Sequence, residues 1–264
     1  MPSDSPAVAH LPRENLRDYL NELTLDLKFR WVPFRAYYRF RAYKYLYRTD
    51  PEMGILKFLV DRNRVSLDLG ANLGLFTYFL ARYSREVYAF EPNPLPYNVL
   101  KDIVDRNVVV RQMAITDLTG EVELVVRRTG RGWTKKGARI DRSGATTGCV
   151  VRVPGSSIDD LGLKDIGFIK MDVEGHELAV LSGALATLKR DKPNLFIENE
   201  YVHAGEKASE VFRMLEDLGY EGFFLRSGTL THLNHFSFEQ YQITPWHQPG
   251  GGASYVRNFI FLPR

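Results

Sequence analysis

The sequence predicts an α/β fold: a doubly wound, mostly parallel, Rossmann-like sheet with antiparallel C-terminal strands, preceded by a helical N-terminal extension. From about residue 61 onward, short apolar runs alternate with amphipathic segments, which is typical of strand–helix–strand units. The last three apolar runs follow one another without long helices, which favours antiparallel pairing. Within 264 residues we therefore expect a helical extension over residues 1–60 and one α/β domain over residues 61–264.

The extension is predicted to hold two helices. The first has apolar residues at helical spacing, at Leu16, Tyr19, Leu20, Leu23 and Leu27. The second follows Pro33 and ends before Pro51, and residues 28–48 combine seven Lys or Arg residues with nine aromatic ones. The simplest interpretation is a helix whose basic stems cover a packed aromatic face. Peripheral contact of residues 28–48 with a membrane surface, or with an anionic glycan, is the alternative, because Trp, Tyr and Arg together suit an interface.

The domain itself divides into strands and helices in a regular order. Five apolar runs are predicted to form strands, over residues 65–70, 87–92, 108–115, 167–175 and 194–200. Helices are expected from Gly74, over residues 94–106, after residue 175 with an apolar face, and in a last segment ending at Gly219. The closing strands are predicted over residues 221–225, 229–233 and 256–262. Such an order buries a parallel sheet between two helical layers.

A basic segment interrupts the domain at residues 127–148, between two predicted strands. Residues 127–142 contain seven Lys or Arg residues and one acid, Asp141, and the segment is rich in Gly, Ser and Thr. This composition predicts a long loop inserted between the strands. The loop is a candidate lid for a ligand that carries a phosphate or carboxylate, and a solvated loop explains it equally well.

Composition excludes several classes of protein. Apolar residues make up 44% of the chain and charged residues 25%, as in ordinary folded proteins. No run approaches the roughly 18 apolar residues of a membrane-spanning helix, and the first residues lack the pattern of a secretory signal. The single cysteine, Cys149, cannot form an internal disulfide and fits a reducing compartment. We expect a cytoplasmic protein.

A glycine turn follows the first predicted strand, at the edge of the sheet where open parallel sheets bind ligands. Gly70 and Gly74 let the backbone turn tightly, and the helix from Gly74 directs its positive end toward an anionic group. Glu91 ends the second strand 21 residues after Gly70, which suits a carboxylate that accepts hydrogen bonds from two ribose hydroxyls. Together the two elements predict an adenosine site.

The spacing of the glycines distinguishes between adenosine ligands. A dinucleotide loop prefers G-x-G-x-x-G, whereas Gly70 and Gly74 give G-x-x-x-G, which disfavours NAD. The segment Asp68-Leu-Gly-Ala-Asn-Leu-Gly74 resembles motif I of class I methyltransferases that use S-adenosylmethionine. Residues 169–177 (IKMDVEGHE), 181–184 (LSGA) and 258–263 (NFIFLP) resemble the FkbM family within that class. The resemblance covers residues 65–263, apart from the extension.

The resemblance implies S-adenosylmethionine as cofactor and assigns residues to it. The family pattern places the methionine part of the cofactor on Asp68, Gly70, Ala71, Asn72 and Gly74. It places the ribose on Glu91, next to Pro92, and the adenine against the segment that holds Met113 and Ala114. Asp172 and Glu174 match the acidic motif beside the methyl group. Family members typically methylate a hydroxyl of a sugar or natural product.

Methyl transfer to a hydroxyl requires alignment of donor and acceptor and removal of a proton. The topology puts five polar candidates near the methyl group, at Asp172, Glu174, His176, Glu198 and His203. Asp172 is the favoured positioning or basic group, with His176 or Glu198 as rival proton acceptors. We expect Glu177 to cap its helix and His203 to be solvated. Asp172, Glu198 and Glu200 could supply oxygen ligands to a divalent ion. The sequence has no compact metal-binding spacing, however, and we assign no metal site.

Three other functions use the same features. An RNA methyltransferase would use the two basic surfaces. However, amino-methylating enzymes carry an Asn/Asp-Pro-Pro-aromatic motif after the fourth strand, where this sequence has residues 172–175 (DVEG). The similar residues 93–97 (NPLPY) follow the second predicted strand instead. A nicotinamide oxidoreductase is disfavoured by the loop spacing, and an inactive adenosine-binding module is the third. We expect a small-molecule or glycan acceptor, with a negative charge if the basic segment at residues 127–148 contacts it, and no nucleic acid partner. No sequence feature specifies an oligomeric state.

Overall fold

The computed structural model describes residues 38–40, 42–44, 51–126, 128–129, 132–133, 139–140, 149–246 and 255–264. The predicted helix at residues 16–27 lies outside these ranges, as do most of residues 28–48 and the side chains of the basic segment at residues 127–148. Of the second predicted helix, the described residues 38–40 and 42–44 are helical. The described part of the chain contains no helix that is both long and apolar enough to cross a membrane.

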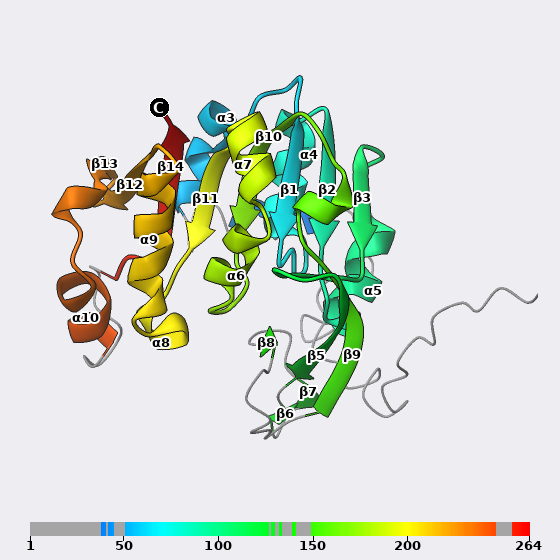
Figure 1. Cartoon of the computed structure of the whole chain (residues 1–264). Helices are drawn as coiled ribbons and strands as arrows, with labels where there is room; N and C mark the ends of the chain where they lie inside the picture. The colour runs from blue at the N-terminus through cyan, green and yellow to red at the C-terminus, as the bar shows by residue number, and fades with distance from the viewer. Residues whose placement is uncertain are drawn as a thin grey trace, which may run out of the picture.

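An eight-stranded sheet forms the centre of the molecule (Figure 1). Its strand order is β13-β12-β14-β11-β10-β1-β2-β3. The strands are β1 (Val65–Leu69), β2 (Glu86–Phe90), β3 (Val108–Arg111), β10 (Ile166–Met171), β11 (Asn194–Glu198), β12 (Tyr220–Arg226), β13 (Thr229–His232) and β14 (Asn258–Pro263). Pairing is parallel from β3 to β11, and β14 pairs antiparallel with both β11 and β12, as β13 does with β12. The predicted fold class is confirmed.

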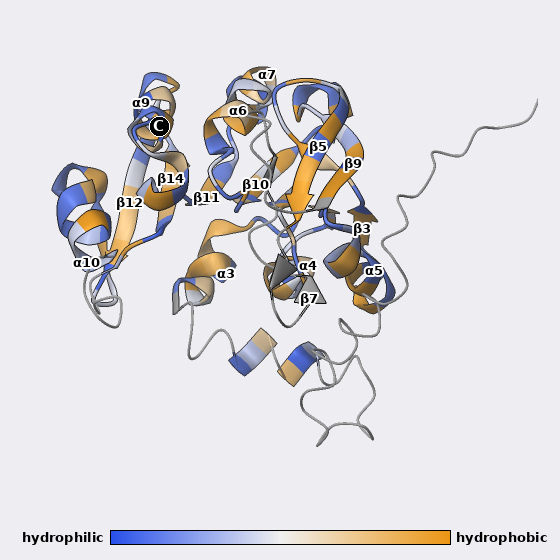
Figure 2. Ribbon diagram, turned by 90° about the horizontal axis from the view of Figure 1, so that it is seen from below, coloured by the Kyte–Doolittle hydropathy of each residue, from blue (hydrophilic) through white to orange (hydrophobic). Residues whose placement is uncertain are grey.

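Helices cover both faces of this sheet (Figures 1 and 2). On one face lie α6 (Glu177–Ser182), α7 (Leu185–Asp191) and α9 (Lys207–Asp217); on the other lie α3 (Leu56–Leu59), α4 (Leu75–Tyr83) and α5 (Pro94–Ile103). Every residue of β1 and β10 is buried, because a central parallel strand is covered from both sides. Two apolar clusters result: one holds Val180 and Leu215, and the other holds Leu80 and Leu100. The core therefore has one half on each face of the sheet.

Two of the predicted helices are interrupted. The helix after residue 175 is divided into α6 and α7 at Gly183, where a Cβ would lie 2.5 Å from the Thr116 carbonyl oxygen. The helix before Gly219 is divided into α8 (Tyr201–Ala204) and α9 at Gly205, whose φ is +59°. In both places a close backbone approach or a left-handed residue prevents the helix from continuing. The remaining short helices of the described residues are η2 (Pro51–Ile55), η3 (Asp159–Leu161), η4 (Leu233–His235), η5 (Glu239–Ile243) and α10 (Thr244–Trp246).

A second, smaller sheet extends past the carboxyl ends of the main strands (Figure 1). Its order is β4 (Ala114–Ile115), β9 (Cys149–Ser156), β5 (Gly120–Val126) and β8 (Arg139–Ile140), and β6 (Arg128–Thr129) pairs with β7 (Gly132–Trp133). The two strands predicted to flank the basic segment are thus the antiparallel pair β5 and β9. Three two-residue strands lie within residues 127–148, so the segment is not loop throughout. The third predicted strand is also divided, with β3 in the main sheet and β4 paired to β9.

Candidate active site

The glycine turn after β1 is fixed by close backbone packing. Gly70, Asn72 and Gly74 all have left-handed φ values, of +72°, +50° and +76°. A Cβ at Gly70 would lie 1.8 Å from the carbonyl oxygen of Asp172, so no other residue fits there. The N–H groups of Gly70 and Ala71 both donate to the Phe90 carbonyl at 3.0 Å, which ties the turn to β2. The structure therefore brings this turn against the ends of both neighbouring strands, β2 and β10.

A buried lysine, Lys170, joins three parts of the site. Its Nζ lies 3.5 Å from Asp68 Oδ1 and 3.5 Å from Asp172 Oδ2, and it donates to the Gly70 carbonyl at 3.1 Å. Asp68 is fully buried and accepts a hydrogen bond of 2.5 Å from the Thr77 hydroxyl. Burial lowers the pKa of Lys170, but the Asp172 and Asp68 carboxylates outweigh burial and raise it. The sequence reasoning passed over Lys170, although it stands two residues before Asp172 in the acidic motif.

The predicted ribose carboxylate, Glu91, lies beside the turn. It is 5% exposed, and its two oxygens accept from the N–H groups of Asn72 at 2.6 Å and Asn93 at 2.8 Å. Burial raises the pKa of Glu91 to about 7, against the lowering effect of these hydrogen bonds. Of the other predicted cofactor residues, Pro92 follows Glu91 directly. Met113 immediately precedes β4, and Ala114 is the first residue of that strand. The glycine turn and the buried carboxylate together fit an adenosine cofactor such as S-adenosylmethionine.

The acidic loop, residues 172–175, is held between this turn and α8. On one side, the Asp172 N–H donates to the Leu69 carbonyl at 3.0 Å. On the other side, Gly175 has a φ of +91°, and a Cβ there would lie 2.8 Å from the His203 carbonyl oxygen. Glu174 is itself left-handed, with a φ of +53°. The loop thus has a cofactor side and an α8 side.

A histidine lies between two carboxylates on the α8 side. His203 Nε2 is 3.3 Å from Glu174 Oε2 and 3.4 Å from Glu200 Oε1, and Glu200 Oε2 accepts from the Tyr255 hydroxyl at 2.5 Å. The Glu200 hydrogen bond, and then the Glu174 charge, raise the pKa of His203 against the effect of its partial burial. His203 is exposed, as expected of a solvated residue, and it is also paired with two carboxylates. The sequence missed this pairing because Glu174 comes from a different part of the chain.

The remaining predicted acids and bases have other surroundings. Burial, and then the Asp172 charge, raise the pKa of Glu198 well above its ordinary value. Burial also acts to raise the pKa of Glu200, but its hydrogen bonds, that from His203 foremost, lower it instead. His176 Nε2 lies 2.8 Å from the Thr116 hydroxyl oxygen, which connects the start of α6 to the end of β4. The surroundings of Glu198 therefore favour its protonated form, and one ring nitrogen of His176 is engaged with Thr116.

Glu177 lies in the first turn of α6, but His176 is the N-cap residue and α6 has no side-chain cap hydrogen bond. Glu177 is the first residue of α6, is 2% exposed, and its Oε1 accepts from the Gly175 N–H at 3.0 Å. The side chain therefore holds the acidic loop at the helix start. No group of three or more His, Cys, Asp or Glu residues in the described ranges is arranged to hold a metal ion.

Comparisons with known proteins find a methyltransferase family and a methyltransferase relative. A family model described as the methyltransferase FkbM domain matches residues 68–221. A hexuronic acid methyltransferase, AglP, from Haloferax volcanii is 25% identical over 173 residues, which are 63% of this chain and 68% of that protein.

Two solved structures are among those found to be similar to the chain. An FkbM methyltransferase from Methylobacillus flagellatus has 17% identity and a TM-score of 0.49, covering 76% of this chain and 44% of that one. An O-methyltransferase from Bacillus cereus, solved in complex with SAH, has 12% identity and a TM-score of 0.48, covering 97% of this chain and 94% of that one. The chain thus spans less than half the length of the Methylobacillus protein. Because the family model matches more than half of the sequence, the chain belongs to the FkbM family of S-adenosylmethionine-dependent methyltransferases.

Proposed function

We propose that the protein is an O-methyltransferase that acts on a hydroxyl of a sugar, glycan or natural-product acceptor. The observation that carries this proposal is the position of His203 between Glu174 and Glu200, on the side of the acidic loop away from the glycine turn. A hydroxyl is a poor nucleophile until its proton is removed, and a paired imidazole is suited to accept that proton. An acceptor bound between the cofactor and α8 would meet this base.

The residues of this chain that would hold the cofactor are those around the glycine turn. The backbone that would approach the cofactor closely is that of Gly70, Ala71, Asn72 and Gly74. Asp68 stabilises this turn because it accepts a hydrogen bond from Thr77 and pairs with Lys170. Glu91 would accept the ribose hydroxyls, Met113 and Ala114 would contact the adenine with Pro92 beside them, and Asp172 lies at the methionine end. When bound, S-adenosylmethionine supplies a methyl group activated by the positive charge of its sulfonium.

Among the candidate bases, His203 has the surroundings that the reaction needs. Burial and the Asp172 charge raise the pKa of Glu198, His176 contacts Thr116, and Asp172 is paired with Lys170. Since the two carboxylates face His203 Nε2, that nitrogen carries hydrogen and Nδ1 offers its lone pair. As the acceptor oxygen gains the methyl group, its O–H proton passes to Nδ1, and the resulting imidazolium is stabilised by Glu174 and Glu200. Asp172 then serves to position rather than to deprotonate the acceptor.

An acidic sugar is the acceptor class that we favour. The related archaeal protein is named a hexuronic acid methyltransferase. The β5–β9 strands, which lead into the basic segment at residues 127–148, extend beyond the carboxyl ends of the main sheet (Figure 1). Lys and Arg residues of that segment would balance the carboxylate of such an acceptor against the acids of the site.

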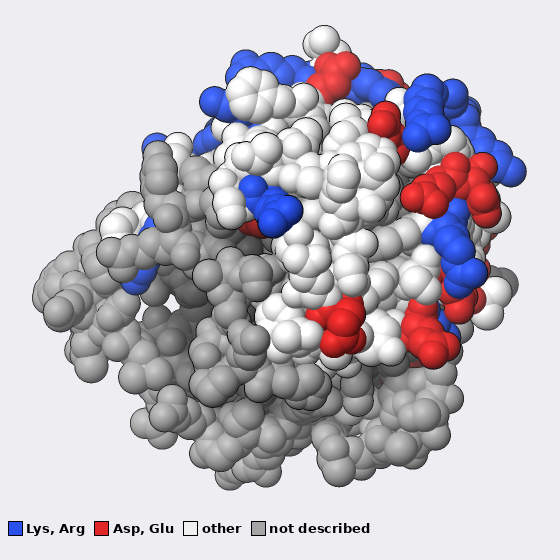
Figure 3. All heavy atoms as spheres, turned by 90° about the vertical axis from the view of Figure 1, so that its left-hand side faces the viewer, with Lys and Arg blue, Asp and Glu red and all other residues white. Residues whose placement is uncertain are grey.

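RNA, the alternative substrate, has less support. The acids around Asp172, Glu174 and Glu200 would repel a phosphate backbone. On the face that carries the β13 edge, described Lys and Arg side chains alternate with Asp and Glu around a mostly uncharged area, without a continuous basic surface (Figure 3). We also keep cytoplasmic location as a proposal, which rests on the single Cys149.

The proposal is tested by incubating the protein with S-adenosylmethionine and separate acceptors, followed by mass spectrometry of the products. Glucuronic and galacturonic acid glycosides, the matching neutral hexosides and RNA form the panel. We expect a methyl group on the uronic acid glycosides that survives mild alkali, because an ether resists alkali and a methyl ester does not. Turnover of RNA alone, or an alkali-labile product alone, would contradict the proposal.

A further inference from the structure

A helical part of the N-terminal extension packs directly against α4. Ala42 is fully buried and Tyr38 is 7% exposed. The Tyr38 ring meets the Tyr78 ring edge-on at 5.6 Å, and the Tyr43 ring meets the rings of Tyr78 at 6.0 Å and Phe79 at 5.6 Å. Because α4 begins directly after the glycine turn, this packing connects the extension to the cofactor site.

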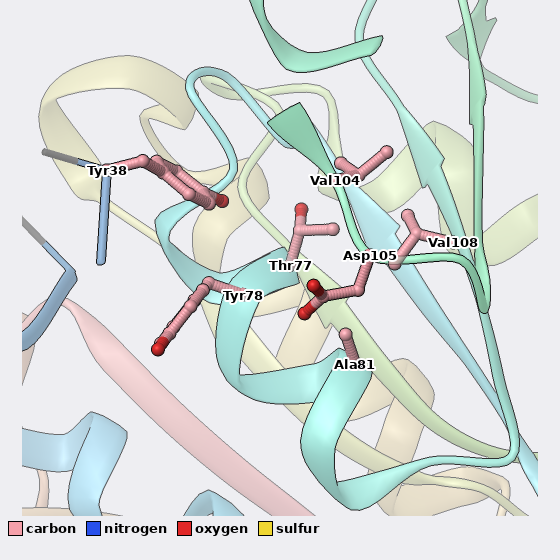
Figure 4. Close-up of a pocket in the computed structure, with 7 residues that line it drawn as sticks. All are labelled: Tyr38, Thr77, Tyr78, Ala81, Val104, Asp105 and Val108. Carbon is pink, nitrogen blue, oxygen red and sulfur yellow. The ribbon is translucent and has the colours of Figure 1, made fainter. Parts of the chain in front are cut away.

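The closest connection is a hydrogen bond from the Tyr38 hydroxyl to the Gly74 carbonyl. Gly74 is the last residue of the turn, and its N–H closes the turn on the Ala71 carbonyl at 2.7 Å. A Cβ at Gly74 would lie 2.6 Å from the Tyr38 hydroxyl oxygen, so the two residues are packed without spare room. The hydroxyl end of Tyr38 is directed toward Thr77, which donates to Asp68 (Figure 4). One phenol thus reaches the junction of turn and helix.

Tyr38 is held by its ring, which packs against Tyr78, and by its hydroxyl, which donates to the Gly74 carbonyl. A small hollow beside the ring is lined in part by Ala81, Val104 and Val108 (Figure 4). Burial, and then the Asp68 and Asp105 charges, raise the pKa of Tyr38 above its ordinary value, so the hydroxyl keeps the proton that it donates.

We propose that Tyr38 is a positioning residue of the cofactor site: its hydroxyl holds the Gly74 carbonyl and so keeps the glycine turn in the conformation that binds S-adenosylmethionine. Tyr38 lies outside the residues 68–221 that the family model matches, so the extension would add this support to the shared domain. Coupling between two sites is reciprocal. Bound cofactor must therefore hold the helical segment more firmly on α4.

The test is a calorimetric titration of the full chain with S-adenosylhomocysteine, comparing wild type, Tyr38→Phe and Tyr43→Phe. We expect Tyr38→Phe to weaken binding by about 3- to 10-fold, because one neutral hydrogen bond no longer favours the competent turn. Tyr43→Phe is the matched control. Tyr43 packs on the same Tyr78 ring, and no partner for its hydroxyl is found among the described residues, so we expect wild-type affinity.

A second measurement keeps the inference testable if Tyr38→Phe does not fold. Hydrogen exchange of the wild-type amides at residues 38–40 and 42–44 is expected to slow when S-adenosylhomocysteine is added. Equal affinities of Tyr38→Phe and wild type, an equal loss in Tyr43→Phe, or unchanged exchange would each overturn the role of Tyr38. Failure of the wild type to bind S-adenosylhomocysteine would overturn it together with the cofactor assignment, and this outcome is separate from the choice of acceptor.

Discussion

Replacing Glu177 by Gln removes a buried titratable group while keeping the shape of the side chain. Oε1 of Glu177 accepts from the Gly175 N–H at 3.0 Å, and Oε2 has no hydrogen-bond partner among the described residues. A Gln in this place retains the acceptor and puts its NH₂ where Oε2 stood. Burial raises the pKa of Glu177 to about 7, from an ordinary value of 4.5. The substitution thus isolates the cost of ionising a buried carboxyl that holds the acidic loop.

The sign and size of the effect follow from linkage. Between pH 4.5 and pH 7 the folded protein binds more protons at Glu177 than the unfolded chain does, so stability falls as the pH rises. At 1.36 kcal/mol per pH unit, the raised pKa corresponds to about 3 kcal/mol, fully present below pH 4.5 and lost above pH 7. Glu177→Gln does not undergo this loss. We expect the variant to gain about 2 to 3 kcal/mol relative to wild type between pH 5 and pH 8.

Urea unfolding of both proteins at pH 5 and pH 8 measures this gain. Glu216→Gln, on the exposed face of α9, is the control because it makes the same change in charge without burial. A difference between Glu177→Gln and wild type that stays constant with pH would refute the reasoning. So would an equal pH-dependent gain in the Glu216→Gln variant.

Four further outcomes are expected from the same geometry. Gly70→Ala should destabilise the protein by about 2 kcal/mol or more in urea unfolding, because its Cβ would meet the Asp172 carbonyl oxygen at 1.8 Å. Gly219→Ala, at a φ of +84° with open space around it, should cost only about 1 kcal/mol. Glu91→Gln should weaken S-adenosylhomocysteine binding about 10-fold. Binding to the wild type should strengthen as the pH rises and Glu91 ionises through a pKa of about 7, whereas binding to the variant should not change with pH for this reason. A wild-type affinity that does not depend on pH would contradict this expectation. His203→Asn should lower kcat about 100-fold or more without changing calorimetric cofactor affinity, whereas a loss confined to KM would remove it as the base.

Elements that depend on local pattern could be predicted from the sequence. The alternation of apolar runs and amphipathic helices gave the parallel sheet, and the closing strands are antiparallel as expected. The adenosine site followed from Gly70, Gly74 and Glu91, because glycine spacing and the ends of strands are fixed by neighbours along the chain. The breaks at Gly183 and Gly205 were not foreseen, since a glycine inside a helical pattern does not by itself show whether the helix continues. Gly183 is packed against the Thr116 carbonyl, whereas Gly205 takes a left-handed φ with open space around it.

The connections within the site were decided by tertiary structure. Lys170 meets Asp68, His203 meets Glu174, and Tyr38 meets Gly74 only after residues from separate elements are packed together. Burial and neighbouring charge then set the pKa of each group, and neither quantity is encoded in local spacing. The sequence by itself determined the family, the order of the elements and the kind of cofactor. The folded chain decided which carboxyl keeps a proton, which histidine is paired, and which residue of the extension reaches the glycine turn, because each depends on contacts between residues far apart in the sequence.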